Sequence, residues 1–251
     1  MDIPNSAPGA RPLSTHTVDS TTIISTAETN ENLEYYHAGP LFTLAELHTN
    51  SLLAKAIKTQ SSERYIPILP QDLEQRGTSP KSIRDQDIRA LLSCDMALFT
   101  YDGTELDAGT VVEYMIAKMA DIPSVILRTD FRGAGDQAGA GDPWNLMTSF
   151  WPRTKTVILD SITGYKEGLS RILKEENVKG LAGEYAIEET ARKVIAAFDE
   201  VRNEPSRLPA ELRKSVYEWL ALMPGLKDGS DQTNIEMLTK LCDIKVEKGL
   251  L

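Results

Sequence analysis

The stretch MALFTYDGTELDAGTVVEYMIAKMADIPSVILR, residues 96–128, decides the fold class. Apolar runs at 96–100 and 124–128 open and close it, and both have the length of buried strands. The residues between them predict a helix over 110–120, which Asp121-Ile122-Pro123 ends. A strand, a helix and a second strand in this order are typical of a parallel βαβ unit.

The same alternation continues on both sides of this stretch. Further strands are expected at 33–37, 65–69 and 156–159, which makes five in all. A helix is expected over 43–58, and Ser79 with Pro80 has the pattern of an N-cap and first turn. We therefore predict an α/β fold with a doubly wound, five-stranded parallel sheet.

Three parts are expected along the chain. Residues 1–32 are rich in Ser, Thr, Pro and Asn, so we predict a disordered tail. Residues 33–161 contain all the predicted strands and would form the α/β domain. Residues 162–251 would form a helical C-terminal extension, with helices near 166–174, 184–202, 209–222 and 232–246. A loop at 133–141 holds four glycines and would be a lid or disordered.

Composition narrows the class of protein. The formal net charge of −10 argues against a nucleic-acid partner, because phosphate binding needs clustered Lys and Arg. No apolar run approaches the roughly 20 residues that span a bilayer, and the start lacks a signal-peptide pattern, so a soluble, cytoplasmic protein is expected. Cys94 and Cys242 form no CxxC pair, so we expect buried, reduced thiols and no metal site.

The segment 102–113, DGTELDAGTVVE, is the first candidate for chemistry. It joins a strand's carboxyl end to a helix, where doubly wound sheets bind ligands. The alternative is structural: Thr110 and Glu113 have the spacing of a capping box, in which Thr110 caps the helix and Glu113 bonds back to the backbone. A helix N-terminus also favours an ionised carboxylate, so both interpretations can hold together.

Two motifs resemble one enzyme family. Tyr36-His37-Ala38-Gly39-Pro40-Leu41-Phe42 is similar to the opening strand and loop of the nucleoside 2-deoxyribosyltransferases, and Asp107-x-Gly109-Thr110-x-x-Glu113 is similar to their nucleophile motif. Asp87 and the segment Asn145-Leu146-Met147 are two further matches to the family, and they occur in the family's order along the chain. The resemblance runs from about residue 35 to 150 and implies a flavodoxin-like fold. His37 departs from the family, and we expect it to be a satisfied core histidine.

The resemblance implies a role for each matching residue. Glu113 would attack C1' of the deoxyribose and hold it as a covalent ester, while Asp107 would contact the sugar hydroxyls. Asp87 would exchange a proton with the nucleobase, because an apolar setting raises a carboxyl pKa; the alternative is an ion pair with Arg84 or Arg89. Tyr36 would orient the nucleophile through its hydroxyl, against the alternative of an ordinary buried aromatic.

Other matches imply substrate contacts. Asn145 and Met147 would reach into a neighbouring subunit's site, which implies a homo-oligomer; a turn Asn followed by core residues is the alternative. The loop at 128–132 would anchor the substrate or pair charges at the surface. The remaining substrate-binding residues that the resemblance implies are Gly39, Phe42, Gly109 and Gln71, and Gln71 fits a surface loop equally well.

The function implied is transfer of 2-deoxyribose between nucleobases with retention at C1', needing no cofactor. The partners would be a 2'-deoxynucleoside and a free nucleobase. One alternative is an N-glycosidase that acts on 2'-deoxynucleosides or nucleoside 5'-monophosphates, in which water resolves the ester. A non-catalytic nucleoside-binding protein is the alternative from another class. Purine or pyrimidine preference is not fixed by the sequence.

Overall fold

The computed structural model describes residues 32–251 except 74–78, 138, 140, 175–179, 224–225 and 227–230. The tail expected at 1–32 lies outside the described residues apart from residue 32. Two described residues of the glycine-rich loop form hydrogen bonds with the segment that follows it. Gln137 donates to the Trp144 carbonyl at 3.1 Å, and Asp136 accepts from the Leu146 N–H at 2.8 Å.

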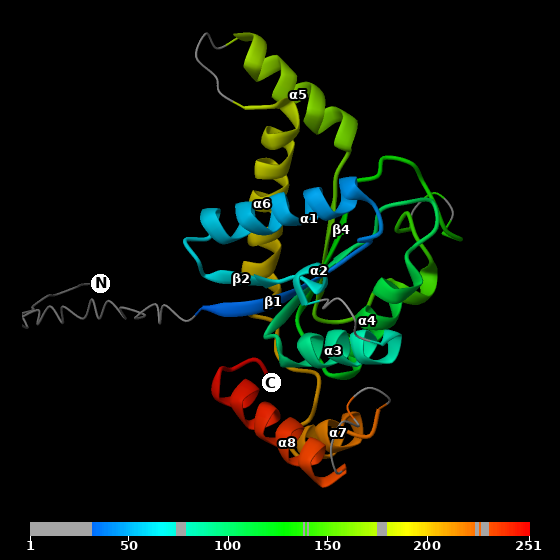
Figure 1. The fold of residues 1–251 in the computed structure, drawn as a ribbon, viewed down its shortest axis with the longest axis vertical. Helices are drawn as coiled ribbons and strands as arrows, with labels where there is room; N and C mark the ends of the chain where they lie inside the picture. The colour runs from blue at the N-terminus through cyan, green and yellow to red at the C-terminus, as the bar shows by residue number, and fades with distance from the viewer. Residues whose placement is uncertain are drawn as a thin grey trace, which may run out of the picture. The chain divides into compact units, whose positions relative to one another are not determined.

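Five parallel strands form one sheet in the order β2-β1-β3-β4-β5 (Figure 1). This confirms the predicted α/β class, and two of the strands have the predicted bounds. The strands are β1 (Leu33–Ala38), β2 (Tyr65–Ile68), β3 (Met96–Thr100), β4 (Ser124–Arg128) and β5 (Thr154–Ile158).

Successive residues of each strand face opposite layers of helices. Tyr36 and Phe99 belong to the apolar cluster that packs with α3 (Pro80–Ser93) and α4 (Ala108–Met119). Their neighbours Tyr35 and Leu98 belong to the cluster on the other face, with α1 (Leu44–Gln60) and α6 (Ala182–Val201). This alternation follows from the two-residue period of a strand. A short helix, α2 (Pro70–Leu73), follows β2.

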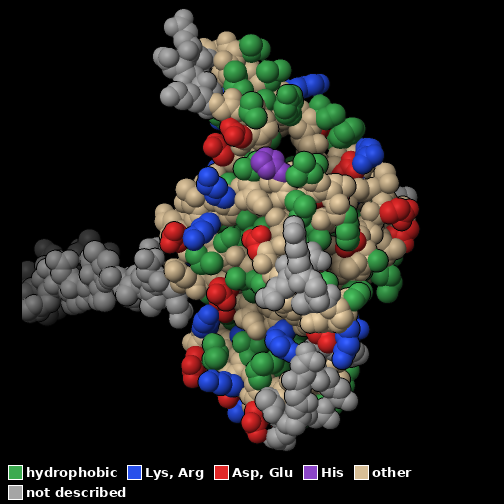
Figure 2. All heavy atoms as spheres, viewed as in Figure 1, with side chains coloured by type: hydrophobic (Ala, Val, Ile, Leu, Met, Phe, Trp, Pro, Cys, Tyr) green, Lys and Arg blue, Asp and Glu red, His purple; other side chains and the backbone are tan. Residues whose placement is uncertain are grey.

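Helix α6 is part of the α/β layers, although it lies beyond residue 161, the expected end of that domain. Val194, Phe198 and Val201 are buried against strand residues, and the Phe198 ring lies 5.0 Å from that of Tyr35. Helix α5 (Ser161–Lys174) packs on α6 and buries only Gly168. Hydrophobic side chains therefore remain on the surface over α5 (Figure 2).

Helices α7 (Arg213–Leu220) and α8 (Asp231–Glu247) cover the ends at which the strands begin. The Tyr217 hydroxyl donates to the Ala120 carbonyl at 3.1 Å, just before β4. Lys245 donates to the carbonyl of Cys94, which caps α3, and Lys248 pairs with Asp95 at 2.9 Å. Cys94 and Cys242 are both buried and free, as expected.

A buried ion pair ties this C-terminal part to the sheet. Arg153 and Asp121 lie 3.0 Å apart, with side chains 1% and 7% exposed. The Asp121 carboxylate also accepts from the Ser206 hydroxyl and the Arg207 N–H, and Arg153 donates to the Leu250 carbonyl at 2.8 Å. Segments far apart in sequence therefore share one charged centre.

We predict that Asp121→Asn lowers the free energy of unfolding by about 3 kcal/mol, because it leaves the buried Arg153 charge uncompensated. Asn tolerates the positive φ of 55° at this position, so the change tests charge alone. Asp199→Asn is the matched control: the Arg64–Asp199 side chains are 38% exposed, and we expect a loss below about 1 kcal/mol. Urea unfolding followed by tryptophan fluorescence measures both, and equal losses would contradict the expectation.

Candidate active site

The candidate site lies at the carboxyl ends of β1 and β3, between the two loops that follow these strands. The β1 loop, Gly39 to Thr43, leads into α1 on one face of the sheet, whereas the β3 loop leads into α4 on the other. Neighbouring strands whose connections leave to opposite faces open a crevice between them. Gly39 is needed here, because a Cβ at this position would lie 2.9 Å from the Thr100 Cβ.

A hydrogen bond joins the two elements across this crevice. The Tyr36 hydroxyl donates to Glu113 Oε1 at 2.6 Å, between residues 77 positions apart in sequence. Tyr36 is fully buried, and its ring is fixed in the core between α3 and α4. The bond holds one carboxylate oxygen of Glu113 and leaves Oε2 available for chemistry.

Burial governs the protonation of Glu113. Desolvation raises its pKa to about 7, and the nearby Asp87 and Asp107 charges raise it as well. The Tyr36 hydrogen bond acts in the opposite direction, because it stabilises the ionised form. Burial, and then the Glu113 carboxylate, raise the pKa of the Tyr36 hydroxyl, which keeps it a donor. Glu113 is therefore poised to change charge near neutral pH.

Three carboxylates face one cavity of about 220 Å³. Its volume lies below the roughly 300–1,000 Å³ of pockets for drug-sized ligands, so it suits one small molecule. Asp87, Asp107 and Glu113 provide its charge. Its other lining residues are Gly39, Leu41, Phe42, Pro70, Ile83, Gly109 and Thr110.

Asp107, not Thr110, caps helix α4. Its Oδ2 accepts from the Thr110 N–H at 2.7 Å and from the Thr110 hydroxyl at 2.9 Å. The expected capping box is therefore wrong: Thr110 is the third helical residue, and Glu113 bonds to Tyr36. Asp107 Oδ1 accepts no hydrogen bond from the described residues. A Cβ at Gly109 would lie 3.1 Å from Asp107 Oδ2, so glycine gives the carboxylate its room.

Asp87 reaches the cavity from α3, where it faces Glu113 and Asp107. The alternative ion pair with Arg84 is wrong, because Arg84 pairs with its neighbour Asp85 at 2.6 Å. The position of Asp87 follows from its place on the same helical stripe as Ile83, which also lines the cavity.

Three of the substrate-binding residues that the resemblance implied lie outside this cavity. The Gln71 amide donates to the Leu47 carbonyl and the Ser51 hydroxyl, so it joins α2 to α1. Asn145 caps the short 3₁₀ helix η1 (Leu146–Thr148) by accepting from the Met147 N–H at 2.9 Å. Met147 is 75% exposed, and neither it nor Asn145 lines the cavity of its own chain.

Arg128 has a role that the sequence did not indicate. It is fully buried and donates to the carbonyls of Tyr101, Gly103 and Arg132. Asp102 completes this link, because its carboxylate accepts from Thr129 at 2.6 Å. Neither expected role fits Arg128: it supports the loop that leads to Asp107. Within the 128–132 loop, Asp130 and Arg132 do form a surface pair at 2.6 Å.

His37 lies on the opposite face of β1 from Tyr36, and its ring is 5.9 Å from that of Tyr35. It is buried, but neither ring nitrogen has a hydrogen-bond partner among the described residues, so the expected satisfied histidine is wrong. Burial lowers its pKa to about 4, which keeps the ring neutral. Among the same residues no cluster of His, Cys, Asp and Glu could hold a metal ion. Nor is any described helix both long and apolar enough to cross a membrane.

Comparison with known proteins gives a family match over this site. Residues 35–147 match the family model for nucleoside 2-deoxyribosyltransferase. Similar solved structures include a conserved protein from Enterococcus faecalis, at 21% identity over 68% of this chain and 99% of that chain, with a TM-score of 0.41. Another is a 2-desoxiribosyltransferase from Leishmania mexicana, at 21% identity over 58% of this chain and 99% of that chain, with a TM-score of 0.39. No curated protein matches the chain.

We predict that Tyr36→Phe raises the pKa of Glu113 above about 7, because it removes the hydrogen bond that lowers that pKa. Tyr35→Phe is the matched control, since the Tyr35 hydroxyl is buried without a partner among the described residues. Carboxyl NMR titration of both variants measures the shift. A Glu113 pKa that is unchanged or lower in Tyr36→Phe would show that the bond does not hold the charge.

Proposed function

We propose that this chain transfers 2-deoxyribose between nucleobases through Glu113. The premise is the match of residues 35–147 to the nucleoside 2-deoxyribosyltransferase family. The family match supports a pentosyltransferase enzyme. The observation that carries the proposal is the Glu113 carboxylate, held by Tyr36 at 2.6 Å and facing a cavity that it shares with two other carboxylates.

The proposed reaction has two displacements at C1'. Glu113 Oε2 attacks C1', the bond from C1' to the base nitrogen breaks, and Asp87 gives its proton to the departing base. An ester then links Glu113 to the sugar. A second base attacks C1', Asp87 takes the proton of the attacking nitrogen, and the Glu113 carboxylate leaves. Two inversions give retention, as in covalent glycosidases.

The surroundings of Glu113 suit both steps. A pKa of about 7 makes this carboxylate a better nucleophile than a solvated glutamate, while much of it is ionised at neutral pH. The Asp107 cap fixes the start of α4, and its Oδ1 can accept from a sugar hydroxyl. Because Asp107 is also bound to Thr110, its position depends on the helix and not on the substrate.

Charge favours a nucleoside over its 5'-monophosphate. Among the described residues that line the cavity, Glu113 and Asp107 carry carboxylates and none is Lys or Arg. Asp87 is not counted as a charge, because the proposed reaction begins with its protonated form. Like charges in one site repel, so a phosphate would meet an unfavourable field. A nucleoside carries no such charge. Deoxynucleoside is therefore the substrate class that we propose.

We predict that Glu113→Ala lowers base exchange at least about 1,000-fold, because it removes the proposed nucleophile. Formation of deoxyadenosine from deoxyinosine and adenine measures exchange. Glu105→Ala, in the exposed part of the same loop, is the matched control and should retain activity. Since Glu113 caps no backbone group, the variant should keep its fold. Near wild-type turnover in Glu113→Ala would defeat the assignment.

The same assay separates transfer from hydrolysis. Deoxyadenosine that forms only when adenine is present supports a transferase. Free deoxyribose in equal amount with and without adenine supports the N-glycosidase alternative instead. Binding of deoxyinosine without either product would favour a non-catalytic nucleoside-binding protein.

We also propose that the site is completed by a second copy of the chain. Asn145 and Met147 match the family segment that reaches a partner's site, and they are exposed in this chain next to Leu146 and Phe150, which are 50% and 76% exposed. A stripe of apolar side chains of this kind suits an interface. The homo-oligomer would place Asn145 over the partner's cavity.

We predict that a mixed pair of one Glu113→Ala chain and one Asn145→Ala chain, made by co-expression, regains about half of wild-type exchange, although each variant alone is impaired. A two-fold pair exchanges equivalent residues, so a mixed pair has one site with both residues intact. The exchange assay on the purified mixed pair measures this. Activity no greater than that of the single variants would contradict a shared site.

A further inference from the structure

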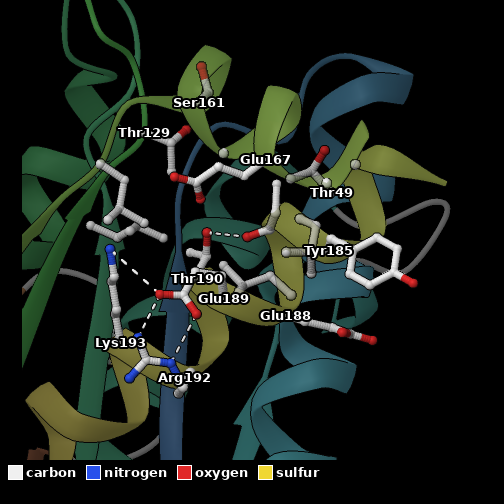
Figure 3. A pocket seen from close by; sticks show the side chains of 18 of the residues that line it. Thr49, Thr129, Ser161, Glu167, Tyr185, Glu188, Glu189, Thr190, Arg192 and Lys193 are labelled. Carbon is white, nitrogen blue, oxygen red and sulfur yellow. Dashed lines mark hydrogen bonds and ion pairs between the residues drawn. The ribbon is translucent and has the colours of Figure 1, made fainter. Parts of the chain in front are cut away.

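The glycine-rich loop, residues 133–141, leads from β4 to the exposed segment, residues 145–147. The chain before the loop passes a separate pocket of about 840 Å³ between α1, α5 and α6, which Thr129 lines (Figure 3). That pocket shares no lining residue with the catalytic cavity. The buried Arg128 then donates to the Arg132 carbonyl at 2.7 Å. The start of the loop is therefore fixed to the core.

Hydrogen bonds tie the loop to the exposed segment and to the residues on both sides of it. The Gln137 amide donates to the Trp144 carbonyl at 3.1 Å and to the Ser149 hydroxyl at 2.7 Å. The Asp136 carboxylate accepts from the Leu146 N–H at 2.8 Å, within the exposed segment itself. Two adjacent side chains of the loop therefore fix the backbone before, within and after the segment.

The loop backbone also packs directly on the backbone where the exposed segment begins. Gly135 has a φ of 82°, which favours glycine, and a Cβ there would lie 2.3 Å from the Trp144 carbonyl carbon. The same Cβ would lie 2.8 Å from the Asn145 nitrogen. A Cβ at Gly133 would meet no atom within 4 Å. The close approach therefore occurs where the loop meets the segment.

Trp144 anchors the start of the exposed segment in the core. Its side chain is buried, and its ring lies 5.6 Å from that of Tyr101 at an angle of 88°. The Tyr101 ring in turn lies 5.9 Å from that of Tyr114 on α4. On the other side the Trp151 indole donates to the Met147 carbonyl at 3.0 Å. The side chains of the segment are exposed, but its backbone is held on both sides.

We propose that the glycine-rich loop is a brace that holds Asn145 and Met147 in place for the partner's cavity. Asp136 and Gln137 are its positioning residues. This inference rests on the proposed shared site. A side chain that reaches into another chain gains from a fixed backbone, because less conformational freedom is lost when the two copies meet. The expected lid over the cavity of the same chain does not fit, since no described residue of the loop lines that cavity.

Gly135→Ala and Gly133→Ala make the same change at a packed and at an open position of the loop. We expect Gly135→Ala to lower base exchange at least about tenfold, because small displacements of a positioned group are costly to the rate. Gly133→Ala is the matched control and should exchange bases as the wild type does. Gln137→Ala removes two hydrogen bonds without backbone strain and should also lower exchange. Wild-type exchange in both Gly135→Ala and Gln137→Ala would overturn the brace.

A mixed pair of one Gln137→Ala chain and one Glu113→Ala chain shows on which site the loop acts. The intact Glu113 then lies in the chain with the altered loop, but its site receives Asn145 from the other chain, whose loop is intact. We expect the purified pair to regain about half of wild-type exchange, since one of its two sites is complete. No gain over the single variants would overturn the proposal, because Gln137 would then act on the site of its own chain.

The mixed pair of Glu113→Ala and Asn145→Ala chains separates failure of the brace from failure of the shared site. If that pair regains base exchange and the pair with Gln137→Ala does not, the brace is wrong and the shared site stands. If neither pair does, the shared site is wrong and the brace falls with it. A wild type without base exchange would refute the proposed reaction itself.

Deuterium uptake by the peptide that contains residues 144–149 tests the brace without any activity. Backbone N–H groups take up deuterium faster where the local structure opens more easily. Gln137→Ala should therefore raise the uptake rate of this peptide severalfold, and Gly133→Ala should leave it as in the wild type. An unchanged rate in Gln137→Ala would overturn the brace, whatever the outcome of the exchange assay.

Discussion

The hydrogen bond from Tyr36 to Glu113 is the interaction on which the rest of the site depends. It joins β1 to α4 at 2.6 Å and holds a carboxylate whose burial would otherwise favour its neutral form. Removing that charge from water is unfavourable, and the phenol compensates part of the cost. The sheet order brings these residues together, because β1 and β3 are neighbours and α4 follows β3 directly. The arrangement of these two side chains is therefore a consequence of the topology.

The carboxyl end of the sheet forms the candidate site, and the amino end is covered by the C-terminal helices. At the carboxyl end, loops hold the carboxylates around a cavity, and Arg128 with Asp102 fixes the segment before Asp107. At the amino end, the C-terminal segment binds the buried Arg153 through the Leu250 carbonyl, and Lys245 of α8 binds the carbonyl of Cys94, the residue that caps α3. Since α3 and α4 carry the cavity carboxylates, the C-terminal part supports the site without forming its walls.

The sequence predicts the layers better than their contacts. The strands at 96–100 and 124–128 and the cap at Ser79 follow from local patterns, and the structure confirms them. The predicted N-cap of α4 was wrong because Asp107 and Thr110 both carry oxygens that can cap a helix. Only the backbone geometry selects Asp107. The buried role of Arg128 was missed because its acceptors are backbone carbonyls, which no sequence pattern marks. The roles implied for Asn145 and Met147 stay predictions, since they concern a second chain.

Mass spectrometry of the peptide that contains Glu113 tests the central claim most directly. The protein is mixed with a deoxynucleoside without an acceptor base, quenched in acid and digested. The account predicts that this peptide gains the mass of one deoxyribosyl group and that the gain disappears when an acceptor base is added before the quench. Turnover with no labelled Glu113 peptide at any quench time, or a label on another carboxylate, would contradict it.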